Sequence, residues 1–151
     1  MFEKTLMLIS KLDASKIQID GAIEYFFSKN YTCAVTLAGA ADEIIGRLLK
    51  ASGKQSSLDF LYDWYQQRFK VKITKMKFSR EIANKARNWL KHAEDDADSQ
   101  YDILELEQDG ILMLMRAVRS YYNLTKTHTE QMVRFSQYID INPEKISALF
   151  S

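Results

Sequence analysis

The fold class is decided by residues 34–49, which read AVTLAGAADEIIGRLL. The aliphatic side chains recur every three to four residues, the period of a helix with one buried face. The glycines and alanines let another helix approach closely, although each helical glycine costs about 1 kcal/mol. The spacing predicts a helix capped by Thr32 and ending near Gly53, and we expect this helix at the centre of a bundle.

The composition agrees with an all-α protein. The chain has 151 residues, 46% of them apolar, with one proline and five glycines. Long helices therefore need few interruptions, and a strand-rich fold lacks its usual turn residues. We expect one domain over residues 1–151, a bundle of five to six helices with its core at about 13–124 and a helical tail at 125–151.

The other helices follow from caps and periodicity. Residues 5–12 are expected to be extended before a helix that Asp13 caps and Asn30 ends, and residues 71–78 to form a loop or short strand. Further helices are predicted from Ser56 or Ser57 to Phe69, from a Ser79 cap to about Ala93, from Glu107 to Leu124 and from Thr129 to Tyr138, with a last turn opened by Asn142-Pro143. The predicted apolar face of the 107–124 helix comprises Ile111, Leu112, Met115, Val118, Arg119 and Tyr122.

The single cysteine fits a reducing compartment, and the hydropathy pattern predicts no membrane-spanning segment. Cys33 is the only cysteine, so an intramolecular disulfide and a multi-cysteine zinc site are excluded. No stretch approaches the roughly 20 apolar residues that span a bilayer, and the start of the chain lacks a signal-peptide pattern. We expect a cytoplasmic protein that does not enter a membrane.

The net charge of +1 conceals two blocks of opposite charge. Residues 68–91 hold nine basic residues and one acid, Glu81, whereas residues 92–109 hold eight acids and no lysine or arginine. The basic block can attract a polyanion, and the acidic block can pair with it or with a partner's basic surface. Two solvated faces that balance each other explain the pattern equally well.

Several common kinds of site lack their sequence pattern. The chain has no glycine-rich loop after a strand, no His-Glu-x-x-His and no Glu-x-x-His. The acidic run 95–98 lacks the alternating ligands and turn glycine of a calcium loop. His128 beside a predicted helix start suits a cap or solvent, and Cys33 suits a small buried apolar residue. No metal and no cofactor is expected.

The predicted 79–93 helix brings together Arg87, Asn88, Lys91 and His92. At about 100° per residue, Asn88 and His92 share a face, while Arg87 and His92 lie roughly 140° apart. Two copies of the helix meeting at a twofold axis can bring both side chains into one cleft. Such a cleft suits RNA cleavage, because histidine moves protons near neutral pH and arginine forks onto a phosphate.

The run Arg87-Asn88-Trp89-Leu90-Lys91-His92 resembles the signature of the HEPN superfamily. In that signature a polar residue follows an Arg, and four to six residues separate the Arg from a His; here the number is four. Residues 34–45 look like the second helix of HEPN-like bacterial proteins, and the resemblance covers roughly 13–124. It implies a helical bundle that dimerises through the motif helices. Active members are metal-independent endoribonucleases, often toxins or antiphage effectors.

The resemblance implies a role for each motif residue. Arg87 would bind the phosphate, His92 would act as general acid or base, and Asn88 would orient His92 or the substrate. Asp42 or Glu43 would supply the acid that some members place on the preceding helix. The basic residues expected to hold RNA are Lys91, Lys85, Arg80 and Lys77.

A second hypothesis keeps the bundle and removes the catalysis. The chain would then be a binding or dimerisation module for a partner such as an antitoxin or a nucleotidyltransferase. In a third interpretation, the bundle is unrelated to HEPN, Arg87 pairs with an acid of residues 94–98, and His92 caps its helix.

Overall fold

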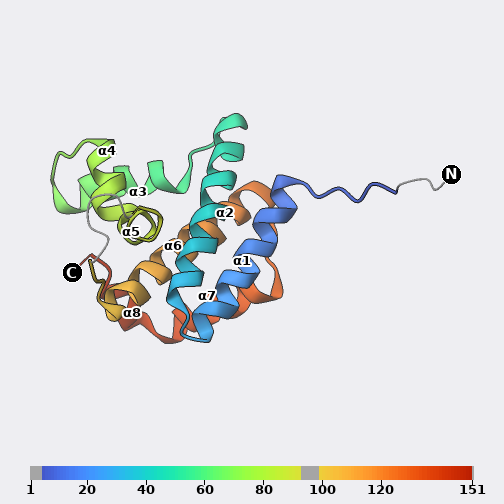
Figure 1. Ribbon diagram of the computed structural model, residues 1–151. Helices are drawn as coiled ribbons and strands as arrows, with labels where there is room; N and C mark the ends of the chain where they lie inside the picture. Colours follow the sequence, from blue (N-terminus) through green and yellow to red (C-terminus); the bar gives the residue numbers. More distant parts are fainter. Residues whose placement is uncertain (1–4, 93–98, 151) are drawn as a thin grey trace.

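The computed structural model describes residues 5–92 and 99–150, and these residues form helices and no strands (Figure 1). In chain order the elements are α1 (Lys11–Phe27), α2 (Tyr31–Ala51), α3 (Ser57–Phe69), α4 (Lys75–Phe78), the π-helical η1 (Ser79–Ala83), α5 (Lys85–Lys91), α6 (Ile103–Thr125), α7 (Glu130–Ile141) and α8 (Pro143–Ser147). The all-α prediction is confirmed. The structure has more helices than the expected five to six. One reason is that the segment predicted as a single helix at 79–93 begins at Lys75 and is divided into α4, η1 and α5.

The bundle is built around α2 and α6. Helix α2 packs chiefly against α1 and α6, and α7 closes the core against α1. Phe26, Ile45, Leu114 and Phe135, one from each of these four helices, are buried in the same core. The central position predicted for residues 34–49 is thus confirmed, but α2 shares it with α6.

Helix α6 is longer and more deeply buried than its sequence predicted. Asp102 caps it by accepting a hydrogen bond from the Leu104 amide at 2.8 Å, and the helix runs without a break through Gly110. The expected apolar face is partly wrong, because Arg119 and Tyr122 are exposed. The side chains of Arg116 and Ser120 are buried instead.

Two helix starts differ from the predicted caps. Ser10 accepts a hydrogen bond from the Asp13 amide at 3.0 Å, so Ser10 caps α1 in place of Asp13. Asn30 accepts from the Cys33 amide at 3.3 Å, so Asn30 caps α2 and Thr32 lies within the helix. Each of these caps stands earlier in the chain than the one predicted, because several residues near each start have suitable oxygens. Ser56 and Thr129 cap α3 and α7 as predicted.

Residues 75–91 form a helical segment that is interrupted at its middle. Thr74 begins it by accepting from the Lys77 amide at 3.2 Å. The expected loop is therefore present over residues 71–74, but residues 75–78 are helical. The Asn84 amide then donates to the Ser79 carbonyl at 2.8 Å, a bond that spans five residues and defines the π turn. Ser79 has helical backbone angles and does not act as the predicted cap.

A buried polar network holds this interruption against the core. Arg116 of α6 pairs with Asp42 of α2 at 2.8 Å, and it also donates to the Ala83 carbonyl and to the Asn84 side chain, both at 2.9 Å. Ser57 of α3 donates to Asp42 at 2.7 Å. One guanidinium therefore ties α2, α3 and α6 to the point where α5 begins.

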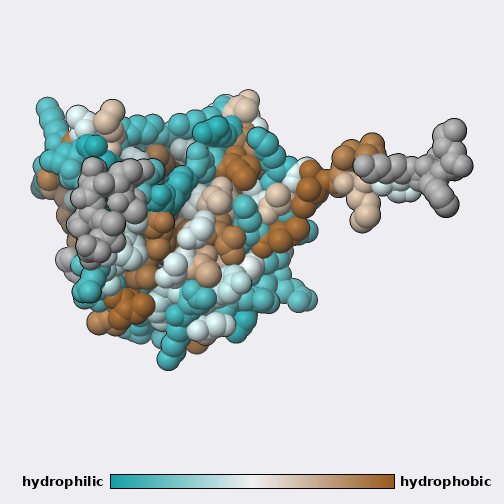
Figure 2. Space-filling view, viewed as in Figure 1, coloured by the Kyte–Doolittle hydropathy of each residue, from teal (hydrophilic) through white to brown (hydrophobic). Residues whose placement is uncertain are grey.

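Two peripheral features complete the fold. Aromatic side chains of α3 pack on the buried Phe78 ring, with Tyr62 and Tyr65 at centroid distances of 5.5 and 5.2 Å. Residues 5–9 extend away from the body as predicted, and they carry hydrophobic side chains into solvent (Figure 2). No helix in the described part of the chain has both the length and the apolar character to cross a bilayer.

Candidate functional site

The Arg87 side chain lies across α2. Gly39 lies directly beneath it, and a Cβ atom at Gly39 would stand 2.8 Å from Arg87 Cδ. The guanidinium reaches Glu43, one turn further along α2, and pairs with its carboxylate. Only 16% of the Arg87 side chain is exposed. The small residues of α2 thus let α5 approach closely enough for this ion pair to form.

The pairing assigns different roles to Asp42 and Glu43, both of which were possible acids for the site. Glu43 faces Arg87, whereas Asp42 is turned inward to Arg116. The hydrogen bond from Arg87 lowers the pKa of Glu43 below its ordinary value, against the opposing effect of burial, and the nearby charges of Arg47 and Lys91 lower it further. Glu43 is therefore an anion that holds Arg87 in place at neutral pH.

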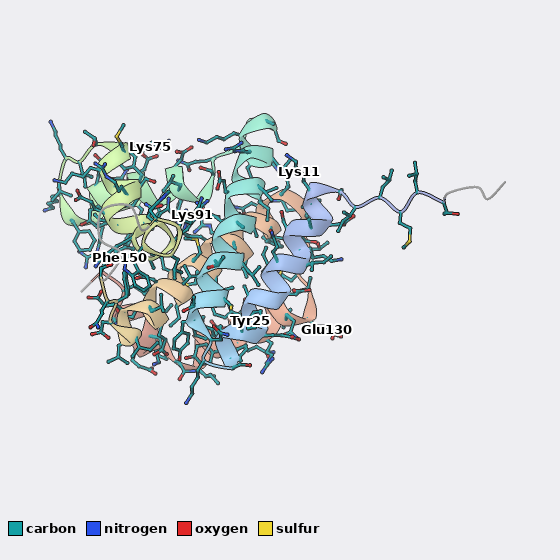
Figure 3. The ribbon with its side chains drawn as sticks, in the orientation of Figure 1. Lys11, Tyr25, Lys75, Lys91, Glu130 and Phe150 are labelled. Atoms are coloured by element: carbon teal, nitrogen blue, oxygen red, sulfur yellow. The ribbon has the colours of Figure 1, made fainter. Side chains whose placement is uncertain are left out.

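A groove of about 510 Å³ lies beside this pair, between α2 and α5. Its positive charge comes from Lys11, Arg47, Arg87 and Lys91, and Glu43 is the one acid among the described residues that line it. In Figure 3 the labelled Lys11 and Lys91 lie on either side of α2. The apolar residues that line the groove are Ala40, Ile44, Leu48 and Leu90. The surface is thus basic at its rim and apolar along α2.

A smaller polar pocket of about 180 Å³ adjoins the groove and shares Glu43, Arg47 and Arg87 with it. Lys50 adds a further positive charge, although its ammonium also lies 3.3 Å from Asp59. The Asp42–Arg116 pair forms part of the lining. With the Asp42–Arg116 pair counted as neutral, the described lining of the groove and the pocket holds five basic residues and one acid, Glu43.

The structure places His92 just after the last residue of α5. Its backbone is extended, its amide donates to the Asn88 carbonyl at 3.1 Å, and its side chain is exposed. Asn88 is half-buried one turn before it. The predicted helix therefore ends at Lys91, and residues 93–98, including the acids that were alternative partners for Arg87, lie outside the described residues.

The basic residues predicted to bind RNA do not form one patch. Lys91 lines the groove with Arg87, whereas Lys85 lies 3.4 Å from Glu105 and 5.4 Å from the Tyr101 ring, in a separate polar pocket. Arg80 and Lys77 are exposed on η1 and α4 and do not line the groove. Three basic residues near Arg87 were not predicted: Lys11 and Arg47 line the groove, and Lys50 lines the adjoining pocket. They stand outside the basic block and come near Arg87 only through the packing of α1 and α2.

The remaining sequence candidates lie apart from this groove. Cys33 is half-buried on α2, and His128 is exposed with its ring stacked on Tyr122 at 4.6 Å. Residues 95–98 of the acidic run lie outside the described residues. Within residues 5–92 and 99–150, no group of three or more His, Cys, Asp and Glu side chains is placed to hold a metal ion.

Replacing Glu43 with glutamine is expected to remove a small, pH-dependent contribution to stability. Because the pKa of Glu43 is lowered in the folded chain, its contribution is present above the ordinary value of about 4.3 and is lost as the pH falls through the lowered value. The carboxylate is 40% exposed, so we expect only about 0.2–1 kcal/mol at pH 7. Urea unfolding of both proteins at pH 7 and pH 3 measures the difference.

The same substitution in an Arg87→Ala background is the matched control. Without the guanidinium, Glu43→Gln should change stability far less at pH 7 than it does in the intact chain. An equal change in both backgrounds would show that Arg87 is not the partner that lowers the pKa of Glu43.

The chain matches no family model, no curated protein and no solved structure. The HEPN resemblance therefore rests on residues 34–45 and 87–92 of this sequence, and it remains a prediction.

Proposed function

We propose that the protein is an HEPN-like, metal-independent endoribonuclease that acts in the cytoplasm as a homodimer, as a toxin or defence effector. The observation that carries the proposal is Arg87, which is held by Glu43 in a groove whose other charged residues, among those that the structure describes, are basic. Such a groove concentrates a polyanion, and a guanidinium is suited to fork onto one of its phosphates. No cofactor is part of the proposed chemistry.

The reaction assigns a task to each motif residue. His92 removes the proton from a ribose 2′-hydroxyl or returns one to the leaving oxygen, and it is exposed where substrate can reach it. Arg87 stabilises the charge that develops on the phosphate in the transition state. Asn88 orients His92 or the substrate. Two chains related by a twofold axis bring both motifs into one shared cleft.

Lys91, Lys11, Arg47 and Lys50 hold the RNA backbone in this proposal, since they surround Arg87. Lys85, Arg80 and Lys77 lie outside the groove and would contact only longer substrates. Exposed cations of this kind release counterions on binding, so RNA affinity should fall steeply as salt rises.

Replacing Arg87 with alanine is the experiment that tests this proposal. The wild-type protein, assayed in EDTA on a single-stranded RNA, should cleave it, and Arg87→Ala should lower the rate by about a hundredfold or more, the loss expected when one group that stabilises transition-state charge is removed. Gel analysis of a labelled RNA measures the rate. Arg134→Ala on the exposed face of α7 is the control and should cleave at the wild-type rate.

Cleavage that requires an added metal ion, or that persists in Arg87→Ala, would overturn the mechanism. Toxicity on expression gives a second readout, because it should disappear with Arg87→Ala if RNA cleavage causes it.

Exposed apolar surface favours a second candidate, a non-catalytic dimerisation or protein-binding module. Leu6, Met7, Leu8 and Ile9 are between 62% and 94% exposed, and the groove is apolar along α2. Contiguous apolar surface of this kind marks interaction sites. A partner such as an antitoxin or nucleotidyltransferase that co-purifies in a fixed ratio, with no RNA cleaved, would support this candidate over the nuclease.

A further inference from the structure

An apolar cavity of about 420 Å³ lies between α3, α6 and α7. Leu112, Met115 and Val118 of α6 line it, at the spacing that the sequence predicted for a buried helix face. Phe60 of α3 and Ile139 of α7 also line it. Because α3 and α7 both pack near α6 without closing over this face, an apolar surface suited to a core remains open.

A polar cavity of about 290 Å³ continues from the apolar one, and the two share Ser57, Phe60 and Arg119. Its charge comes from Lys54, Arg119 and Lys126, and none of the described residues that line it is a carboxylate. Asp140, at the apolar cavity, is the one acid that the structure places in the lining of either space. An elongated hollow thus has an apolar body and a cationic end.

The three cations at this end have neutral partners. The Arg119 guanidinium lies 3.9 Å from the centre of the Phe60 ring, the Lys54 ammonium donates to the Asn123 carbonyl at 3.1 Å, and the Lys126 ammonium is 5.5 Å from the centre of the Tyr122 ring. No ion pair joins any of them to an acid within residues 5–92 and 99–150. Their charges are therefore available to an anion, and the Phe60 ring fixes the Arg119 guanidinium where the two cavities meet.

We propose that this double cavity binds a small amphipathic anion, with an aliphatic body against α6 and a carboxylate or phosphate head among Lys54, Arg119 and Lys126. Ligand sites in helical bundles are of this kind, concave and mostly apolar, with a few polar groups that set orientation and a volume of about 300–1,000 Å³. The ligand is held by burial of its chain and by the forked guanidinium of Arg119. This site is separate from the RNA groove and does not depend on the nuclease proposal.

The test is calorimetric titration of the full chain with decanoate, decyl phosphate and decanol, the two anions below the concentrations at which they form micelles and decanol below its solubility limit. At least one anion should bind one-to-one, at least tenfold more tightly than decanol, and more weakly as salt is raised. If decanoate binds more tightly than decyl phosphate, the preferred head group is a carboxylate, and the reverse order identifies a phosphate. Equal binding of decanol and both anions, or no saturable binding of either anion, would overturn the proposal.

Two variants locate the ligand. Ser136 is an exposed residue of α7 that lines the apolar cavity, so Ser136→Trp should fill it and remove binding at no cost to the core. Arg119→Gln should weaken the anions at least tenfold and leave decanol unchanged. Arg134→Gln, an exposed position of α7 outside both cavities, is the matched control for lost surface charge and should bind the anions like the wild type. Unchanged anion binding in Arg119→Gln would contradict the proposed head-group site.

Discussion

Replacing Asp42 with alanine is expected to destabilise the protein by about 3–5 kcal/mol, the cost of leaving a buried charge without its partner. The side chains of Asp42 and Arg116 are each only 7% exposed. Alanine leaves the guanidinium without its counter-charge, and it also removes the acceptor of the Ser57 hydroxyl. For a chain of this length the melting temperature should fall by about 10 °C or more. Urea unfolding and differential scanning calorimetry measure the two quantities.

Two comparisons separate the buried pair from a general effect of losing an acid. Asp63→Ala removes an exposed carboxylate on α3 and should change stability by no more than about 0.5 kcal/mol. Arg116→Ala should cost at least as much as Asp42→Ala, because it also leaves the Ala83 carbonyl without its donor. The double variant should be clearly less destabilised than the sum of the two single ones. Additive losses would mean that the pair is not coupled as the structure places it.

The network around Arg116 also explains which parts of the fold the sequence could predict. The period of residues 34–49 and the caps at Ser56 and Thr129 depend on neighbours within a few positions, so they could be predicted and are confirmed. The π turn at Ser79–Ala83 could not, because Arg116, which binds the Ala83 carbonyl, lies 33 residues further along the chain. Local periodicity therefore predicted one straight helix where the structure has an interrupted one.

The candidate site was predictable to a similar degree. Arg87, Asn88 and His92 follow from a short motif, and an acid on the preceding helix was expected at position 42 or 43. Which of these two acids faces Arg87 depends on how α2 is rotated about its axis. Only the contacts that Arg87 and Arg116 make with α2 show that rotation. Arg47 offered one local signal, since it stands four residues after Glu43 and pairs with it at 3.1 Å. That spacing is common on exposed helix faces, and it does not indicate a binding groove.

Replacing His92 with alanine is expected to lower the rate of RNA cleavage by about a hundredfold to ten-thousandfold, the range that a general acid or base contributes. RNA affinity should change little, because the groove keeps its lysines and arginines. The loss should therefore appear in kcat and leave KM nearly unchanged. Single-turnover cleavage of a labelled RNA, with binding measured separately, distinguishes the two.

The pH dependence distinguishes proton transfer from a structural effect of the same substitution. Wild-type cleavage should show a step as the pH is varied, because a general acid or base acts in only one protonation state, and the residual activity of His92→Ala should lack that step. His128→Ala removes the other histidine, which stacks on Tyr122 away from the groove, and it should keep both the rate and the step. If His92→Ala retains the wild-type profile, His92 moves no proton and the proposed mechanism is wrong. If the wild-type protein cleaves no RNA at all, the groove between α2 and α5 binds its polyanion without cleaving it. The apolar residues along α2 would then be the first surface to search for a protein partner.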